Sequence, residues 1–377
     1  MRNPSQSDVA GERPVRIAHL MQYLSVGGIE RMVERMAIAG PAHGLEVEVI
    51  AYLEDGPLRP LLTGRGISVH LLPTRPGLAP MLPLRLARHL RRRGVDVVHS
   101  HHVGPFLYGG AAARLAGAAH VHTEHSVEFY DAARRRAIGR AMPHFAQVVC
   151  VAQEIADWRQ EHLGTDDVVV ENGVAIPALA PEARAEARAA LGLDPDAFVV
   201  GCLARLSPEK DHATLVSAFA LVAAERPGAH LVLVGDGTAR ADLERQIADT
   251  SLSDRVSVLG RRLDTDAILP AFDVGALASV REGLPLALLE IMATATPVVA
   301  TAVGGIPALL AQGGGAVVPA SDPAALAAAL LAYAAAPDRI AADGRAARAL
   351  VESRYSDTEM NRRYAELYRR AVAGRRR

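Results

Sequence analysis

Short apolar runs alternate with longer amphipathic segments along nearly the whole chain. The runs are almost continuously apolar, a pattern that is typical of parallel strands buried on both faces. The segments between them, such as 29–40 and 83–94, carry apolar residues at helical spacing. This alternation predicts right-handed βαβ units in an α/β fold with doubly wound sheets. We predict strands at 15–24, 45–53, 67–73, 95–101, 118–125 and 146–152, and again at 198–206, 230–237, 255–261, 274–279, 297–303 and 315–319.

The alternation stops once, in a segment rich in proline, alanine and charged residues at 175–197. A chain of 377 residues is long for one core, so we interpret this segment as a connection between two domains. The last helix has apolar residues on one face and is expected to pack against another part of the protein. The predicted organisation is a flexible tail over 1–13, an N-terminal α/β domain over 14–175, a linker over 176–197, a C-terminal α/β domain over 198–354 and a C-terminal helix over 355–377.

Composition and charge describe an ordinary soluble globular protein. Hydrophobic residues make up 50% of the chain and the formal net charge is −1, so overall charge gives no reason to expect a nucleic-acid partner. The two cysteines, Cys150 and Cys202, lie within apolar runs and are expected to be buried free thiols, as in a reducing compartment. No run of about 18 apolar residues is free of charges and helix breakers, and the N-terminus lacks the apolar core of a signal peptide. These features predict a cytoplasmic protein.

Ligands of open α/β sheets bind beyond the carboxyl ends of the strands, so chemistry is expected in the loops that follow strands. Gly27 and Gly28 follow the first strand. Backbone N–H groups at the start of the next helix would suit an anion there, and a plain strand–helix turn is the alternative. Their spacing is not the GxGxxG of a dinucleotide site.

Histidines gather after two other strands, in HSHH (99–102) and HVHTEH (120–125). Alternation along a strand places His120 and His122 on one face, whereas His125 lies past the strand end. This spacing does not favour zinc. We expect His125 to meet a polar ligand and the other histidines to be turn or core residues.

The stretch RLSPEKDHATL (205–215) places Arg205 and Lys210 at a strand tip, beside a helix that begins at Asp211 or His212. Lys210 is the only lysine in the sequence. Arginine binds phosphate as a planar fork and lysine as a compact point charge, so the pair suits a departing diphosphate. Taken alone, two solvated surface cations are the commoner explanation.

The stretch REGLPLALLE (281–290) changes that balance. Glu282 and Gly283 form a loop after a strand, and Pro285 stands where a first helical turn begins, which leaves backbone N–H groups free to face an anion. Glu290 follows in an otherwise apolar helix. A buried carboxylate needs hydrogen-bond donors, and sugar or ribose hydroxyls are suitable.

These stretches resemble the GT4 family of retaining glycosyltransferases, which have the GT-B fold. The resemblance spans 14–370 and rests on VGGIER, VHTEH, CLARLSPEKDHATL, LVLVGDG, VSVLG and REGLPLALLE. It implies two Rossmann-like domains that face each other across a cleft, an N-terminal acceptor side and a C-terminal side that binds the nucleotide sugar. It further implies transfer of a sugar from a nucleoside-diphosphate sugar to a hydroxyl of a saccharide or lipid-linked acceptor, in bacterial polysaccharide or glycolipid synthesis. The expected reaction retains the anomeric configuration and uses no cofactor and no metal.

The resemblance also implies roles for individual residues. Arg205 and Lys210 would hold the donor diphosphate, and Glu290 would bond the ribose. The transferred sugar would be held by His125, by Glu282 and by the backbone of Gly283 and Leu284, and Pro285 would belong to the same donor site. Gly27 and Gly28 would lie against the diphosphate and the acceptor, and the nucleotide would be bordered by Gly235, Gly260 and Arg261. The C-terminal helix would cross back onto the N-terminal domain.

Two features depart from a simple match. Ala308 stands where family members often have a glutamate. The triplet Asp264-Thr265-Asp266 spells a metal motif of a different glycosyltransferase fold, and we interpret either aspartate as a helix N-cap instead. Two alternatives stay open, a GT-B enzyme such as a sugar-nucleotide epimerase and a non-catalytic nucleotide-sugar-binding subunit. Glu124 and Glu128, which flank His125, also stay open as carboxylates for the reaction.

One predicted helix is strongly basic. Its arginines stand among leucines, and a second basic run covers 134–136. Such a face would contact anionic lipid at the inner side of the cell membrane, or it is simply solvated. The arginines predicted to make this peripheral contact are Arg85, Arg88, Arg91 and Arg92.

Overall fold

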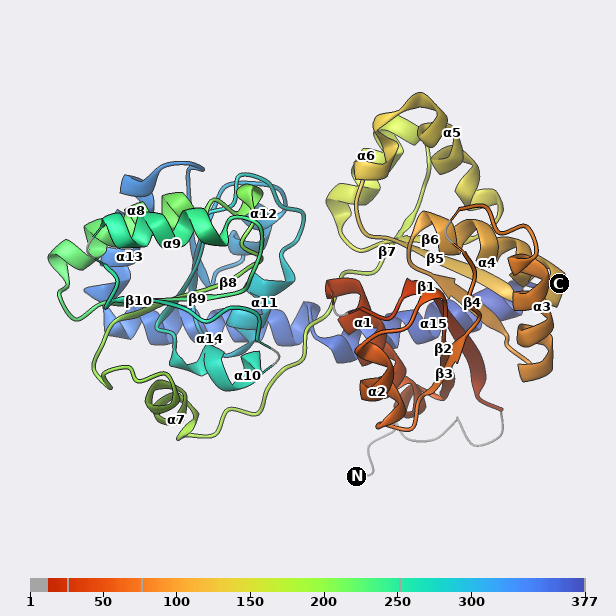
Figure 1. The fold of residues 1–377 in the computed structure, drawn as a ribbon, viewed down its shortest axis with the longest axis horizontal. Helices are drawn as coiled ribbons and strands as arrows, with labels where there is room; N and C mark the ends of the chain where they lie inside the picture. The colour runs from red at the N-terminus through yellow and green to blue at the C-terminus, as the bar shows by residue number, and fades with distance from the viewer. Residues whose placement is uncertain (1–12, 26, 76, 251, 263, 376–377) are drawn as a thin grey trace, which may run out of the picture. The chain divides into compact units, whose positions relative to one another are not determined.

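The computed structural model describes residues 13–25, 27–75, 77–250, 252–262 and 264–375 (Figure 1). The chain divides into two compact units, the described parts of Met1–Asn172 with Asp357–Arg377, and Gly173–Ser356. The predicted tail over 1–13 lies outside the described residues except for Arg13, whose guanidinium donates two hydrogen bonds of 2.6 and 2.8 Å to the Asp96 carboxylate. Arg13 is therefore anchored by an ion pair.

The first unit contains a seven-stranded parallel sheet in the order β3-β2-β1-β4-β5-β6-β7. The six strands predicted before residue 152 are all present. The seventh has only two residues, too few to produce a recognisable apolar run. The strands are β1 (Val15–Tyr23), β2 (Leu45–Glu54), β3 (Ser68–Leu71), β4 (Val97–Ser100), β5 (Ala119–Glu124), β6 (Gln147–Cys150) and β7 (Val168–Val169).

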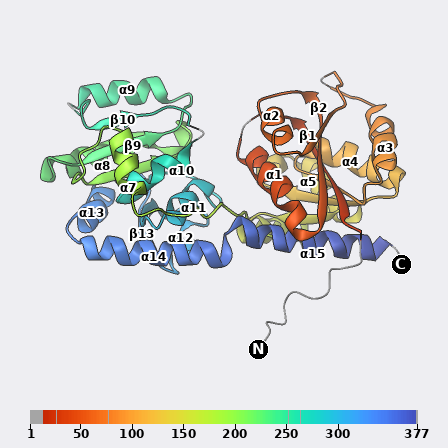
Figure 2. The ribbon, with the colours of Figure 1, turned by 90° about the horizontal axis from the view of Figure 1, so that it is seen from below.

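Helices cover both faces of this sheet and bury its apolar side chains, and Cys150 is buried and free, as predicted. The C-terminal helix α15 runs along one face of the unit (Figure 2). Its Tyr364 and Tyr368 are 1% exposed and pack with Ile17 and Val121 of the sheet. The helices of the unit are α1 (Gly28–Ala39), α2 (Leu58–Thr63), α3 (Leu82–Arg93), α4 (Val103–Ala116), α5 (Ala133–Ala141), α6 (Gln153–Leu163) and α15 (Asp357–Arg375).

The second unit contains a six-stranded parallel sheet in the order β10-β9-β8-β11-β12-β13. All six strands predicted after residue 197 are present, and Cys202 is buried and free. The strands are β8 (Val199–Leu203), β9 (His230–Val234), β10 (Val256–Val258), β11 (Val274–Leu277), β12 (Val298–Thr301) and β13 (Gly315–Val318). The helices are α7 (Ala183–Ala190), α8 (His212–Glu225), α9 (Arg240–Asp249), α10 (Thr265–Ile268), α11 (Leu286–Ala293), α12 (Ile306–Leu310), α13 (Pro323–Ala334) and α14 (Pro337–Arg354). Each unit is thus a doubly wound α/β sheet, the predicted fold class.

The segment predicted as a linker, 176–197, contains α7 and packs on the second unit. Arg188 of this helix is buried and its guanidinium lies 2.7 Å from the Asp273 carboxylate, which also accepts a 2.8 Å hydrogen bond from the Val199 N–H. The segment is therefore part of that unit's structure, and through Asp273 it is linked to the first residue of β8.

Among the described residues, no single helix has both the length and the apolar composition needed to cross a membrane. The pair α13 and α14 meets those criteria only when the two are taken together, and it bends by 103° at the break between them.

Candidate functional site

The carboxyl ends of the strands in the second unit carry loops that are tied together by backbone hydrogen bonds. These loops hold most of the residues predicted to bind the donor. The tying bonds run from Leu206 N to Asp236 O (3.1 Å), from Gly235 N to Gly260 O (2.9 Å), from Val280 N to Glu209 O (2.9 Å) and from Gly305 N to Gly283 O (3.1 Å). The sequence stretches at 205–211, 235–237, 259–261 and 279–285 therefore form one continuous surface.

Glycine is needed where two of these loops touch. A Cβ at Gly235 would lie 1.8 Å from the Ala204 carbonyl oxygen, and its φ of +151° is one that other residues rarely adopt. A Cβ at Gly304, whose φ is +53°, would lie 2.1 Å from the Glu282 carbonyl oxygen. The backbone that carries Glu282 and Gly283 therefore rests directly on a second glycine loop.

Lys210 and Glu282 meet on this surface. The Lys210 ammonium donates a 2.6 Å hydrogen bond to Glu282 Oε1, which also accepts a 2.6 Å hydrogen bond from the Ser279 hydroxyl. The side chains are 19% and 8% exposed. The two residues are 72 positions apart in the chain, so the fold joins two motifs that the sequence presents separately. Glu282 is held in place by two donors and carries the charge that pairs with the only lysine.

Arg205 is more exposed and has a partner that the sequence analysis did not single out. Its guanidinium lies 2.9 Å from the Glu209 carboxylate, and the Arg205 side chain is 71% exposed. Glu209 also accepts a 2.7 Å hydrogen bond from the Ser207 hydroxyl. That bond is the main reason that the pKa of Glu209 falls to about 2, and the Arg205 guanidinium adds to it. The i,i+4 spacing of Arg205 and Glu209 was visible in the sequence and could have revealed the pair.

The helix starts agree with the predictions in part. Asp211 caps α8, and its carboxylate accepts a 3.2 Å hydrogen bond from the Thr214 N–H. Pro285 precedes α11, and no side chain caps that helix start. Glu290 of α11 was expected to be buried, but it is only half-buried. Asp264 precedes α10 but does not cap it. Its carboxylate instead pairs with the Arg262 guanidinium, with a 2.8 Å hydrogen bond from Nε, so the N-cap prediction is wrong at this position.

In the first unit, α1 begins at Gly28, the second of the two predicted glycines, and Gly27 immediately precedes it. The start of this helix faces an acidic side chain of its own first turn. Glu30 accepts a 2.9 Å hydrogen bond from the Ser25 hydroxyl, and its other carboxylate oxygen would lie 2.6 Å from a Cβ at Gly27. An anionic ligand approaching Gly27 and Gly28 would have to displace this carboxylate. The sequence analysis did not consider Glu30.

His125 follows β5, is half-buried, and its Nε2 lies 3.4 Å from Nδ1 of His101. His120 and His122 are buried, and each is hydrogen-bonded to the Ser100 hydroxyl at 2.9 Å. They are core residues on one face of the strand, as predicted. Burial lowers the pKa of His125 to about 3 and that of His120 to about 4, so both rings are neutral at pH 7.

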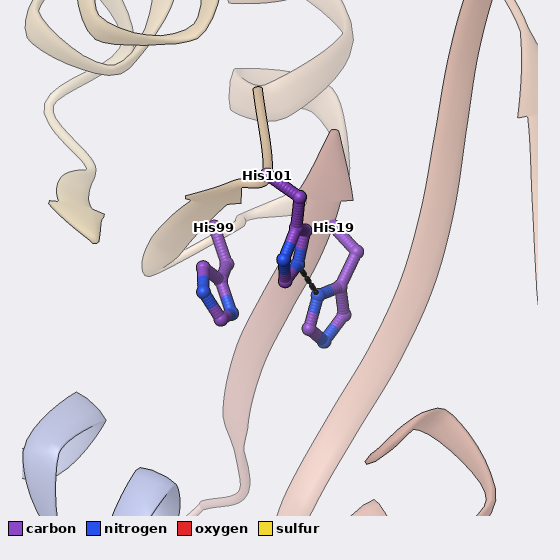
Figure 3. A group of neighbouring side chains, drawn as sticks. All are labelled: His19, His99 and His101. Carbon is purple, nitrogen blue, oxygen red and sulfur yellow. Dashed lines mark hydrogen bonds between the residues drawn. The ribbon is translucent and has the colours of Figure 1, made fainter. Parts of the chain in front are cut away.

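Three other ring nitrogens, from His19, His99 and His101, lie within 4.8 Å of one another (Figure 3). The donor set does not suit a metal well. Both nitrogens of His99 are hydrogen-bonded to hydroxyls, at 2.6 Å to Thr123 and 2.7 Å to Tyr368, and His19 and His101 are bonded to each other. A metal would have to break these bonds to obtain its ligands, so we interpret the group as a hydrogen-bonded network.

A second group, Glu48 with His70 and His89, has geometry that could also hold a metal ion. The Arg93 guanidinium lies 3.0 Å from the same Glu48 carboxylate and supplies the positive charge. Glu48 and Arg93 border a hollow of about 460 Å³ at the amino ends of β1 to β3, the edge opposite to the one that carries His125. We therefore assign no reaction to this edge.

Glu124 is not placed as an exposed nucleophile. Its carboxylate accepts a hydrogen bond from the Tyr130 hydroxyl and lies 3.5 Å from the Arg159 guanidinium, which is bonded more closely to Asp167 at 2.6 Å. Burial raises the pKa of Glu124 to about 7. The side chain of Glu128 lies outside the described part of the structure.

Comparison with known proteins gives the identity of the family. Residues 26–176 match the family model described as Glycosyltransferase Family 4, and residues 197–335 match the one described as Glycosyl transferases group 1. A D-inositol 3-phosphate glycosyltransferase from Mycolicibacterium gilvum is 30% identical over 85% of this chain and 82% of its own length. The chain belongs to glycosyltransferase family 4. No finding supports an epimerase or a non-catalytic subunit.

Two further relatives extend the comparison for this glycosyltransferase. The UDP-Gal:alpha-D-GlcNAc-diphosphoundecaprenol alpha-1,3-galactosyltransferase of Escherichia coli is 28% identical over 77% of this chain and 80% of its own length. The crystal structure of HepE from Anabaena, in complex with UDP and glucose, superposes with a TM-score of 0.80. It is 24% identical and covers 94% of this chain and 99% of its own. This similarity shows that the family-4 glycosyltransferase has the GT-B fold.

Proposed function

We propose that this glycosyltransferase moves a sugar from a nucleoside-diphosphate sugar to a hydroxyl of a lipid-linked or saccharide acceptor in bacterial glycolipid or polysaccharide synthesis, and that it retains the anomeric configuration. The observation that carries the proposal is the Lys210–Glu282 pair at the carboxyl edge of the second sheet. It joins a compact cation and a fixed carboxylate beside the uncapped start of α11. The galactosyltransferase of Escherichia coli, named for its UDP-Gal donor, supports the choice of donor class.

In this proposal Lys210 and Arg205 stabilise the negative charge that develops on the departing diphosphate, so no metal is required. The N–H groups at the start of α11 add a partial positive charge at the same edge. Glu282, held by Lys210 and Ser279, accepts hydrogen bonds from hydroxyls of the transferred sugar, and Glu290 accepts them from the ribose. The acceptor hydroxyl attacks from the face that the diphosphate leaves, and a phosphate oxygen takes its proton.

A thermal-shift screen of UDP-, GDP- and ADP-sugars tests donor binding, because a ligand that binds only the folded state stabilises it. The selected donor is then incubated with a lipid-linked acceptor, and NMR of the product gives the anomeric configuration. We expect retention, and we expect EDTA to leave the rate unchanged. A product of inverted configuration, or activity that EDTA abolishes and Mg²⁺ restores, would contradict the mechanism.

We further propose that the enzyme works at an anionic membrane surface, which it contacts through α3. All four predicted arginines are exposed on this helix, and two of them, Arg85 and Arg91, also donate to the backbone carbonyls of Pro73 and Leu115. Exposed apolar side chains lie at the start of α3 and just before it, at Leu78, Met81 and Leu84. Basic and apolar groups side by side are what an interfacial helix needs.

Co-sedimentation with vesicles tests the membrane contact. We expect binding to phosphatidylglycerol vesicles, weaker binding after Arg88→Ser/Arg92→Ser, and weaker binding after Leu78→Ser/Met81→Ser. Binding to neutral vesicles that equals binding to anionic ones would contradict the electrostatic part of the proposal.

A further inference from the structure

Three imidazoles form a hydrogen-bonded line that ends at His125. His19 of β1 is bonded through Nδ1 to Nε2 of His101 at 2.9 Å (Figure 3), and His101 is bonded through Nδ1 to Nε2 of His125 at 3.4 Å. His19 is 1% exposed and His101 is fully buried, whereas His125 is half-buried at the strand end. Each link in the line uses one nitrogen of each ring, so the middle ring has no nitrogen left for another partner.

We propose that His101 and His19 are positioning residues, which fix the orientation of the His125 ring and decide whether its outer nitrogen donates or accepts a hydrogen bond. The inference rests on the proposed function in one respect, since His125 is the group predicted to meet the transferred sugar. It adds two buried residues, His101 and His19, which were not among the predicted site residues.

The argument follows from the chemistry of neutral imidazole, which has one N–H donor and one lone-pair acceptor. Burial lowers the pKa of each ring in the line, so all three are neutral at pH 7. If His19 donates to His101, then His101 must donate to His125, and the outer Nδ1 of His125 carries a proton. If the bonds run the other way, that nitrogen is an acceptor. The tautomer of His125 therefore cannot change unless both inner rings change with it.

Other buried histidines of the same sheet are arranged differently. His99 bonds to the Thr123 and Tyr368 hydroxyls, and His120 bonds to Ser100. A hydroxyl rotates to donate or accept, so these partners transmit no fixed direction. Only imidazole–imidazole links do so, and among the described residues they lead to the strand end where His125 lies. His120 is therefore a suitable control, since it is also buried, at 8% exposure, but lies outside the line.

Asparagine and glutamine variants distinguish the roles of the two ring nitrogens of His101. Asparagine places its amide near the position of Nδ1 and so replaces the contact with His125, whereas glutamine reaches the position of Nε2 and replaces the contact with His19. We expect His101→Gln and His101→Leu to lower kcat about tenfold or more, the scale of a misplaced reacting group, with donor KM little changed. We expect His101→Asn to recover most of the rate, and His120→Gln to have no such effect.

Two measurements separate positioning from general structural damage. In a His125→Ala background, His101→Leu should cause no further loss of kcat, because both changes remove the same function. Long-range ¹H–¹⁵N NMR of histidine-labelled protein should show one tautomer of His125 in the wild type and a mixture in His101→Gln and in His19→Leu. If the His101 variants do not fold, the same comparison is made with His19→Asn and His19→Leu.

Three results would overturn the proposal. The first is equal loss of kcat in His101→Asn and His101→Gln. The second is an unchanged His125 tautomer in every variant of the inner rings. The third is a stoichiometric metal in the purified protein that His101→Asn releases, which would make the line a metal site. The NMR measurement needs no substrate, so failure of the proposed transfer reaction would be distinguished from failure of this inference.

Discussion

The ion pair between Lys210 and Glu282 gives the sharpest prediction. Replacing Lys210 with methionine keeps the apolar stem but removes the ammonium from the Glu282 carboxylate, which is only 8% exposed and still accepts a hydrogen bond from the Ser279 hydroxyl. We expect this variant to lose both stability and transfer, for separable reasons. Stability falls because a nearly buried charge loses its counter-charge. Transfer falls because the departing diphosphate loses a cation.

The size of the stability loss follows from the burial of the pair. Removing one partner of a buried ion pair lowers the free energy of unfolding by about 3–5 kcal/mol. Because the Lys210 side chain is 19% exposed and water partly screens the pair, we expect a loss of about 2–3 kcal/mol here. For a unit of this size, 1 kcal/mol shifts Tm by about 2–4 °C, so we expect a drop of about 5–10 °C. For transfer, loss of one charge-stabilising donor lowers kcat by about 10²–10³.

The double variant Lys210→Met/Glu282→Gln separates the two effects. The neutral glutamine can still accept a hydrogen bond from the Ser279 hydroxyl. The free energy of unfolding should therefore return to within about 1 kcal/mol of the wild-type value, while transfer stays low. Thermal unfolding and a transfer assay at saturating donor are run on both variants. Near-normal transfer in Lys210→Met, or recovery of transfer together with stability in the double variant, would refute the role of Lys210 in binding the diphosphate.

The remaining predictions concern neighbouring parts of the molecule. Lys210→Arg should impair transfer far more than the reverse exchange at exposed Arg88, because a planar fork does not replace a compact ammonium; steady-state rates of both variants check this. Glu209→Gln should raise donor KM several-fold with little change in Tm, because Arg205 loses its fixed partner at an exposed site; substrate titrations would show it. Gly304→Ala should destabilise the protein by at least about 1 kcal/mol and raise donor KM, because its Cβ would collide with the Glu282 carbonyl; denaturant unfolding measures the first effect. Glu124, whose pKa is raised to about 7 in the folded protein, keeps a proton there that the unfolded chain releases near pH 4.5, so its own contribution to stability should fall as pH rises between those values; the stability of the wild type relative to Glu124→Gln should therefore be lower at pH 8 than at pH 5, and unfolding of both proteins at the two pH values tests this.

The strands could be predicted because buried parallel strands leave continuous apolar runs, and twelve such runs correspond to twelve observed strands. β7 was missed because it has only two residues. α7 was missed because it lies in an alanine- and arginine-rich segment, where Arg188 pairs with Asp273, a residue far away in the sequence. The donor-site motifs were found because their spacing is local. Glu30 was missed because the position of its carboxylate beside Gly27 depends on the side-chain rotamer, which the sequence does not define. The His19–His101 contact was missed because it joins β1 to the residue that follows β4, and only the order of strands in the sheet makes these two strands neighbours.

The position of α15 has a consequence for the order in which the protein becomes folded. Tyr364 and Tyr368 complete a core that includes Ile17 and Val121, although the whole second unit lies between them in the chain. During synthesis the second unit is complete and able to fold while the first still lacks a helix of its core. A fragment that stops at Asn172 would expose the side chains that α15 covers, among them His99, which bonds to Tyr368, and Thr123, which bonds to Tyr364. The N-terminal half is therefore expected to need the last helix of the chain, supplied covalently or as a peptide, before it can be studied as a folded protein.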